Sequence, residues 1–126
     1  PFAVAPDAQE TWKLYAVVRA DLKMSAGKTS SQSGHAYLGS FLKADPPRQS
    51  AYHADGIGTK VCLVCVNAYQ LVRIHQQALQ AGLPAVLIED TGNNTCFNGV
   101  PTLTAVGIGP VRSSEVPFLK RLSLHP

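Results

Sequence analysis

RADLKMSAGKTSSQSGHAYLGSFLK, residues 19–43, decides the fold, because the side-chain pattern changes within it from that of a strand to that of a helix. The residues that lead into it, 12–19, are largely apolar on both alternating faces, which predicts a central strand. Residues 24–27 are typical of a turn, and helical spacing begins at Lys28. The stretch therefore predicts a strand, a turn and a helix, which is the building unit of α/β domains.

The junction between this strand and this helix is a usual place for a ligand in α/β domains, because a helix N-terminus offers unpaired N–H groups and a positive dipole end. Lys28, Gln32 and His35 are four and three residues apart, so they share one stripe of the helix. The apolar face of the helix is expected to carry three large side chains, Leu38, Phe41 and Leu42. We therefore expect the polar stripe to lie at the margin of that face, where side chains are held by packing and still reach solvent.

Further along the chain, segments with strand and helix patterns alternate. Strands are expected at residues 60–66, 84–89, 103–108 and 121–124, and helices at 48–54 and 68–81. Strand–helix–strand units with crossovers of this length favour a mostly parallel sheet that is covered on both faces. The fold class that the sequence predicts is therefore α/β.

The composition fits one globular domain. The 126 residues are 45% hydrophobic and 15% charged, so we expect residues 12–126 to form a single domain and residues 1–11 an N-terminal extension. The net charge of +3, from 11 basic and 8 acidic side chains, only mildly favours an anionic partner. There is no run of 18 apolar residues, so we expect no membrane span and a cytoplasmic location, with an organelle left open if a targeting segment has been removed.

The three cysteines, Cys62, Cys65 and Cys96, are too few and too irregularly spaced for a disulfide framework. Cys62 and Cys65 lie in a predicted strand, where positions three apart point to opposite faces. They are therefore expected to be buried separately, and the sequence predicts no metal site.

Asp90 follows the predicted strand at 84–89, at the end of a strand where α/β sheets present catalytic groups. Its alternative is an aspartate that forms a turn or caps a helix. Lys28 lies in the first turn of a helix, where the dipole disfavours a cation, so its presence suggests a purpose beyond solvation. For His35 the alternative to a functional role is a structural one, a hydrogen bond to a neighbour at the margin of the helix. His75 is expected to be a packed side chain without a functional role.

Residues 17–36 resemble the signature of the second type of peptidyl-tRNA hydrolase, found in archaea and eukaryotes, V-V-R-x-D-L-x-M-x-x-G-K-x-x-x-Q-x-x-H-A. Three later segments look like the family's G-L-P, D-A-G and T-V-x-x-I-G-P blocks, namely residues 82–84, 88–92 and 104–110. The resemblance covers about residues 14–124. It implies a three-layer α/β/α fold around a mixed sheet of about four strands, often in a homodimer.

The resemblance also implies an activity, the hydrolysis of the ester that joins a peptide to the 3′ ribose of tRNA, with peptidyl-tRNA as the partner and no cofactor. It suggests that Asp90 orients or deprotonates water, that Lys28 stabilises the oxyanion and that His35 assists proton transfer. Five further side chains are expected to bind the substrate, namely Arg19, Lys23, Gln32, Thr95 and Thr104.

The chain departs from the family pattern after Asp90. The family usually reads D-A-G-R-T, whereas residues 90–95 read DTGNNT, so the arginine is lost and the threonine is displaced to Thr95. Two extra residues lie between Asp90 and the I-G-P block, which predicts a reshaped loop at 93–101. The sequence thus suggests a divergent branch of the family. It leaves two alternatives open: a non-catalytic domain that binds tRNA or protein, and a hydrolase of another acyl ester.

Overall fold

A computed structural model of the chain describes residues 10–54, 56–91 and 97–126. Its strands are β1 (Lys13–Arg19), β2 (Thr59–Cys65), β3 (Ala85–Asp90), β4 (Thr102–Val111) and β5 (Ser123–Leu124). Its helices are α2 (Ala26–Lys43), α3 (Pro46–His53) and α4 (Ala68–Gln80), and two short 3-10 helices follow β4, η1 (Ser113–Glu115) and η2 (Pro117–Leu119). Each of these strands and α-helices was predicted from the sequence, with bounds that differ by a few residues.

The five strands form one mixed sheet in the order β3-β4-β1-β2-β5. Only β1 and β2 are paired in parallel, from Lys13 opposite Thr59 to Arg19 opposite Cys65, and the other three pairs are antiparallel. The α/β class and the mixed sheet are confirmed, but the expectation of a mostly parallel sheet of about four strands is wrong. The helical crossovers do give β1, β2 and β3 one common direction. The antiparallel β4 is inserted between β3 and β1, however, and the short β5 adds an antiparallel edge.

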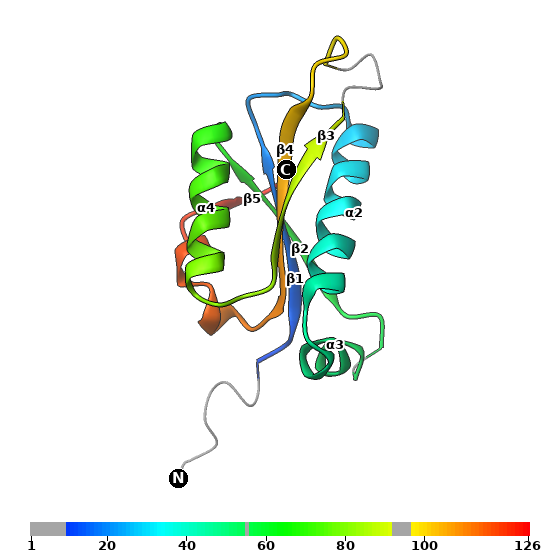
Figure 1. The fold of residues 1–126 in the computed structure, drawn as a ribbon, viewed down its shortest axis with the longest axis vertical. Helices are drawn as coiled ribbons and strands as arrows, with labels where there is room; N and C mark the ends of the chain where they lie inside the picture. Colours follow the sequence, from blue (N-terminus) through cyan, green and yellow to red (C-terminus); the bar gives the residue numbers. More distant parts are fainter. Residues whose placement is uncertain (1–9, 55, 92–96) are drawn as a thin grey trace.

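Helices cover both faces of the sheet, which gives the three layers that were expected. Figure 1 shows α2 on one side of the sheet and α4 on the other, with α3 following the C-terminal end of α2. Both α2 and α4 contact β1, β3 and β4, the three strands that form the middle and one side of the sheet. The N-terminal ends of these two helices lie at the same end of the molecule as the C-terminal end of β3 (Figure 1).

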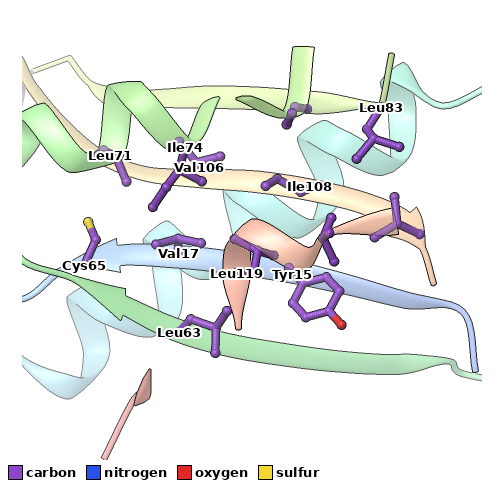
Figure 2. Packing of buried hydrophobic residues seen from close by; sticks show 14 residues of the cluster. Tyr15, Val17, Leu63, Cys65, Leu71, Ile74, Leu83, Val106, Ile108 and Leu119 are labelled. Carbon is purple, nitrogen blue, oxygen red and sulfur yellow. The ribbon is translucent and has the colours of Figure 1, made fainter. Parts of the chain in front are cut away.

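The two faces of the sheet have different cores. Toward α4, Tyr15 and Val17 of β1 pack with large aliphatic side chains such as Leu71 and Ile74, as Figure 2 shows. Toward α2, the core of buried residues is small and consists of Ala16, Val18, Ala36 and Ala105. Burial of a large aliphatic side chain contributes about 1.5–3 kcal/mol, so the α4 face contributes most of the apolar stabilisation.

The sheet-facing side of α2 differs from the one predicted. Its buried residues are small or polar, namely Thr29, Gln32, Ser33, Ala36 and Ser40. Leu38 and Leu42, which were expected to be buried, are 59% and 67% exposed. The reason lies in β4, where a Cβ added to Gly107 would be 1.9 Å from the Ala36 carbonyl oxygen. The helix backbone therefore rests directly on the sheet, and Gln32 faces the sheet instead of its margin.

Cys62 and Cys65 point to opposite faces of β2, as predicted, and both are free thiols. Cys65 packs in the core toward α4, where burial raises the pKa of its thiol to about 11. Cys62 lies toward α2, with its Sγ 3.5 Å from Ser33 Oγ. The raised pKa of Cys65 disfavours its thiolate, and Cys96 lies outside the described residues.

Candidate active site

Three elements bring polar side chains together at one end of the sheet. Asp90 is the last residue of β3, and Lys28 lies in the first turn of α2. The helix begins where the Ser25 side chain accepts a hydrogen bond from the backbone N–H of Lys28, at 3.1 Å. Thr104 comes from β4, which pairs with β3 up to Asp90 opposite Thr102. The site is thus built on two strands and a capped helix N-terminus.

An ion pair between Lys28 and Asp90 forms the centre of the site. Lys28 Nζ lies 2.5 Å from Asp90 Oδ2, and the side chains are only 14% and 7% exposed. The helix dipole disfavours a cation in the first turn of α2, and no acidic residue of that turn offsets this effect. The Asp90 carboxylate beside the ammonium makes this position favourable for Lys28. Removal of one partner from a buried ion pair leaves an uncompensated charge, which typically lowers the free energy of unfolding by about 3–5 kcal/mol.

Gln32 donates to the same Asp90 carboxylate oxygen as Lys28, and Thr104 holds Gln32 in place. Gln32 Nε2 donates to Asp90 Oδ2 at 3.3 Å, and Thr104 Oγ1 donates to Gln32 Oε1 at 2.5 Å. The hydroxyl therefore fixes which end of the amide points to the carboxylate. Thr104 is the extra residue where the β3–β4 register shifts, a local irregularity of the kind that re-aims a side chain. Gln32 is 3% exposed and Thr104 0%, so both support Asp90 from within the protein.

A small pocket opens beside the Lys28 ammonium, with a volume of about 190 Å³. It is lined by Leu22, Lys23, Met24, Ser25, Lys28 and Phe97. Lys28 Nζ lies 5.5 Å from the centre of the Phe97 ring, within the range of a cation–π contact. Lys23 is exposed and has a positive φ of 50°, an uncommon backbone conformation for a residue other than glycine. Sequence reasoning missed Phe97, whose only signal is an aromatic residue in a polar loop.

Arg19, which was predicted to bind substrate, is engaged by protein groups. Its guanidinium donates to both Asp21 carboxylate oxygens, at 3.0 and 2.8 Å, and to the Leu103 carbonyl oxygen at 2.9 Å. The hydrogen bonds from Arg19 hold the pKa of Asp21 below its usual range. Arg19 thus ties the end of β1 to the start of β4, and Asp21 balances its charge.

His35 is exposed on α2, and its side chain makes no hydrogen bond within the described part of the chain. It lies seven positions after Lys28 in the helix, or roughly 10 Å along the helix axis. The structure therefore brings Lys28 and Gln32 of the predicted stripe to Asp90 and leaves His35 apart from them. Thr95, the remaining predicted residue, lies outside the described residues.

Within residues 10–54, 56–91 and 97–126, no group of three or more His, Cys, Asp or Glu side chains is arranged to hold a metal ion. None of the helices in these ranges is both long and apolar enough to cross a membrane.

The arrangement of these groups suits hydrolysis of an ester with an anionic leaving group. A carboxylate can orient and deprotonate water, and a neighbouring ammonium can stabilise the oxyanion that follows. An ammonium can donate three hydrogen bonds, and Asp90 takes one from Lys28. The helix N-terminus adds a positive field that favours phosphate. The fold and the site together define an α/β domain with a carboxylate–lysine centre.

Comparison with known proteins gives the family. The family model described as "Peptidyl-tRNA hydrolase PTH2" matches residues 12–124, and the chain belongs to this family. A peptidyl-tRNA hydrolase of Methanopyrus kandleri is 39% identical over 106 residues, which cover 83% of this chain and 90% of the relative. One from Methanocaldococcus jannaschii is 37% identical over 108 residues, covering 82% and 90%.

A similar fold occurs in a solved structure of a protein of unknown function from Agrobacterium tumefaciens strain C58. The TM-score is 0.58, and the alignment covers 90% of this chain and 97% of that one. The sequence identity is 14%, so this likeness concerns the fold alone.

Proposed function

We propose that this protein hydrolyses the ester of peptidyl-tRNA and releases the peptide and free tRNA. The observation that carries the proposal is the Lys28–Asp90 ion pair at the N-terminus of α2, in a chain that belongs to the peptidyl-tRNA hydrolase family. The compartment we propose is the cytoplasm, or an organelle that has its own ribosomes, because peptidyl-tRNA forms where ribosomes translate.

In the proposed reaction, water attacks the ester carbonyl carbon and passes a proton to Asp90. The Lys28 ammonium stabilises the tetrahedral oxyanion, a contribution that is typically about 10²–10³ in rate for one well-placed donor. The carbon–oxygen bond to the ribose then breaks, and the 3′ oxygen takes up the proton that Asp90 holds. The products are the 3′ hydroxyl of tRNA and a peptide carboxylic acid, which loses its remaining proton to solvent and becomes a carboxylate, so Asp90 returns to its starting state.

Gln32 and Thr104 take a different part in this proposal from the one that the sequence suggested. Their side chains are buried and directed at each other and at Asp90, so we assign them as positioning residues and not as substrate ligands. Lys23 is exposed beside the pocket and is the better candidate for a phosphate contact. Arg19 stabilises the loop that carries Lys23 through Asp21 and the Leu103 carbonyl.

The first test is turnover on N-acetylaminoacyl-tRNA, the simplest mimic of peptidyl-tRNA. We expect hydrolysis at the same rate with and without EDTA, because the proposed steps use protein groups alone, and slower hydrolysis of free aminoacyl-tRNA. Release of tRNA is followed by gel electrophoresis. Binding of tRNA without turnover would favour a non-catalytic domain. Loss of activity in EDTA with recovery in zinc would overturn the mechanism, and equal rates on blocked and free substrates would indicate a general esterase.

A second prediction concerns the salt dependence of tRNA binding. Lys23, Lys28 and the N-terminus of α2 gather positive charge at one end of a chain with a net charge of only +3. If they contact two to four phosphates near the single-stranded acceptor end, log Kd should change with log salt with a slope of roughly 1.5 to 3 in magnitude. Fluorescence anisotropy with several tRNAs measures this slope. A salt-independent affinity, or strong preference for one tRNA sequence, would contradict phosphate recognition.

A third prediction concerns the homodimer, which we propose forms through the outer face of α2. Leu38 and Leu42 lie one turn apart on this helix, and Ile57 is 89% exposed. Leu38 and Ile57 also line an apolar groove of about 380 Å³. Exposed apolar groups of this kind are typical of an interface. Light scattering should show a dimer that Leu38→Glu with Leu42→Glu converts to a monomer. Leu79→Glu on α4, where Leu79 is 53% exposed, should remain dimeric; a monomeric parent protein would contradict the proposal.

A further inference from the structure

β3 lies at the edge of the sheet, and its outer side has no strand beside it within the described part of the chain. Its only strand partner there is β4, with Ala85 opposite Ile108 and Val86 opposite Gly107. In Figure 1, β3 lies between α4 and α2, and neither helix crosses it. An open strand edge presents backbone N–H and C=O groups to whatever lies alongside it.

The register shows which backbone groups of β3 face outward. The Gly109 N–H donates to the Pro84 carbonyl at 3.0 Å, so the groups of Pro84 point toward β4. Successive residues of a strand alternate, so Val86 and Ile88 also point toward β4, whereas Ala85 and Leu87 point outward. The register shift after Ile88 places its extra residue, Thr104, in β4. The alternation along β3 therefore continues, and the N–H and C=O of Glu89 also point outward.

This edge ends at Asp90, whose carboxylate takes a proton from the attacking water in the proposed reaction. Peptides on tRNA differ in sequence and share only their backbone, so a site that serves all of them has to recognise backbone groups. A β-strand edge does this, because main-chain hydrogen bonds give affinity without reading side chains. The strand β3 therefore offers both an open edge that can bind a peptide backbone and, at its end, the carboxylate of the proposed reaction.

We propose that the peptide of peptidyl-tRNA binds as an added strand along the outer edge of β3, paired with the backbone of Glu89 and Leu87. This inference rests on the proposed function and names the peptide subsite of the same site. The ester is at the C-terminal end of the peptide and has to lie at Asp90, which is the C-terminal end of β3. The peptide therefore runs parallel to β3, and each outward-facing residue accepts one hydrogen bond from it and donates one to it.

The geometry sets a length dependence. A strand rises about 3.3 Å per residue, so Leu87 lies roughly 10 Å before Asp90, and a substrate needs about four residues to pair with both Glu89 and Leu87. Each outward-facing residue that is engaged should raise kcat/KM about 2- to 10-fold. Longer peptides should gain little more, because the next outward-facing residue, Ala85, is the first residue of the strand.

The test uses N-acetylated alanyl-tRNAs with one, two and four residues, and we expect kcat/KM to rise stepwise to four residues. Leu87→Pro removes the outward N–H without removing a bond to β4, a position at which an edge strand tolerates proline. The variant should lose the gain between two and four residues and keep the rate on the single-residue substrate. Leu87→Ala, which retains the N–H, should keep the full gain. Equal kcat/KM at all lengths, or an unchanged gain in a folded Leu87→Pro, would overturn the proposal.

A second measurement avoids any folding defect, because it alters the substrate. In the four-residue peptide, N-methylation of the amide that pairs with the Leu87 carbonyl should reduce kcat/KM of the unaltered protein to the two-residue value. N-methylation of an amide that faces away from β3 should have little effect. Equal effects at both positions would count against the added strand. Failure of the proposed function looks different, since even the single-residue substrate would then remain intact.

Discussion

Asp90→Asn should lower kcat by about 10²-fold or more while the protein remains folded. Asparagine has nearly the same shape, but it cannot take a proton from water and cannot form the ion pair with Lys28. The Gln32 amide, held by Thr104, would then face a partner that carries no charge. Single-turnover hydrolysis of N-acetylaminoacyl-tRNA measures the rate, and thermal unfolding monitors the fold.

His75→Gln is the matched control for a polar substitution away from the site. His75 lies on α4, the helix on the opposite face of the sheet from α2, and burial lowers the pKa of its imidazole. Since neither the fold nor the site assigns it a chemical task, the variant should keep nearly full kcat. Full activity of Asp90→Asn would show that the carboxylate is not the base.

The strand–turn–helix junction could be predicted because its signals are local. Apolar residues on both alternating faces predict β1, and the change to helical spacing at Lys28 predicts α2, which in the structure begins two residues earlier, after its cap Ser25. The position of Asp90 at the end of a strand follows in the same way from residues 84–90. These patterns also limit where Lys28 and Asp90 can lie, so the central pair of the site was accessible from the sequence.

The buried face of α2 could not be predicted from the helix itself. Leu38 and Leu42 have the composition of a core face, but the face that packs is chosen by Gly107 on β4, which lets the helix backbone approach the sheet. The information lies about seventy residues away in the chain. The same non-local contact turns Gln32 inward and leaves His35 in solvent, so two residues of one predicted stripe have different surroundings.

The strand pairing was missed for a related reason. Crossover helices determine direction, and β1, β2 and β3 do share one direction, but direction does not determine which strands are neighbours. The eleven residues between β3 and β4 join two strands that pair antiparallel, and β4 separates β3 from β1. For the single residue Arg19, the position in the motif suggests that its side chain binds substrate. In the structure its guanidinium donates hydrogen bonds to Asp21 and to the Leu103 carbonyl, contacts that the sequence does not indicate.

Lys28→Ala should lower kcat by about 10²–10³-fold, because it removes the donor assigned to the oxyanion. It also leaves the buried Asp90 carboxylate without its cation, so thermal unfolding has to be measured beside the rate. Lys23→Ala is the matched control. Lys23 lines the same pocket and is exposed, so its loss should weaken tRNA binding and the salt slope while kcat stays within about twofold.

The double variant Asp90→Asn with Lys28→Ala distinguishes a catalytic pair from two independent contributions. Groups that act as one unit lose their effect together, so the double variant should be about as slow as the slower single variant. Two independent groups would multiply their losses to roughly 10⁴-fold or more. Multiplied losses would therefore contradict the shared step in which Asp90 activates the water while Lys28 holds the oxyanion. A Lys28→Ala protein that unfolds at lower temperature but keeps its kcat when folded would assign the lysine to stability alone.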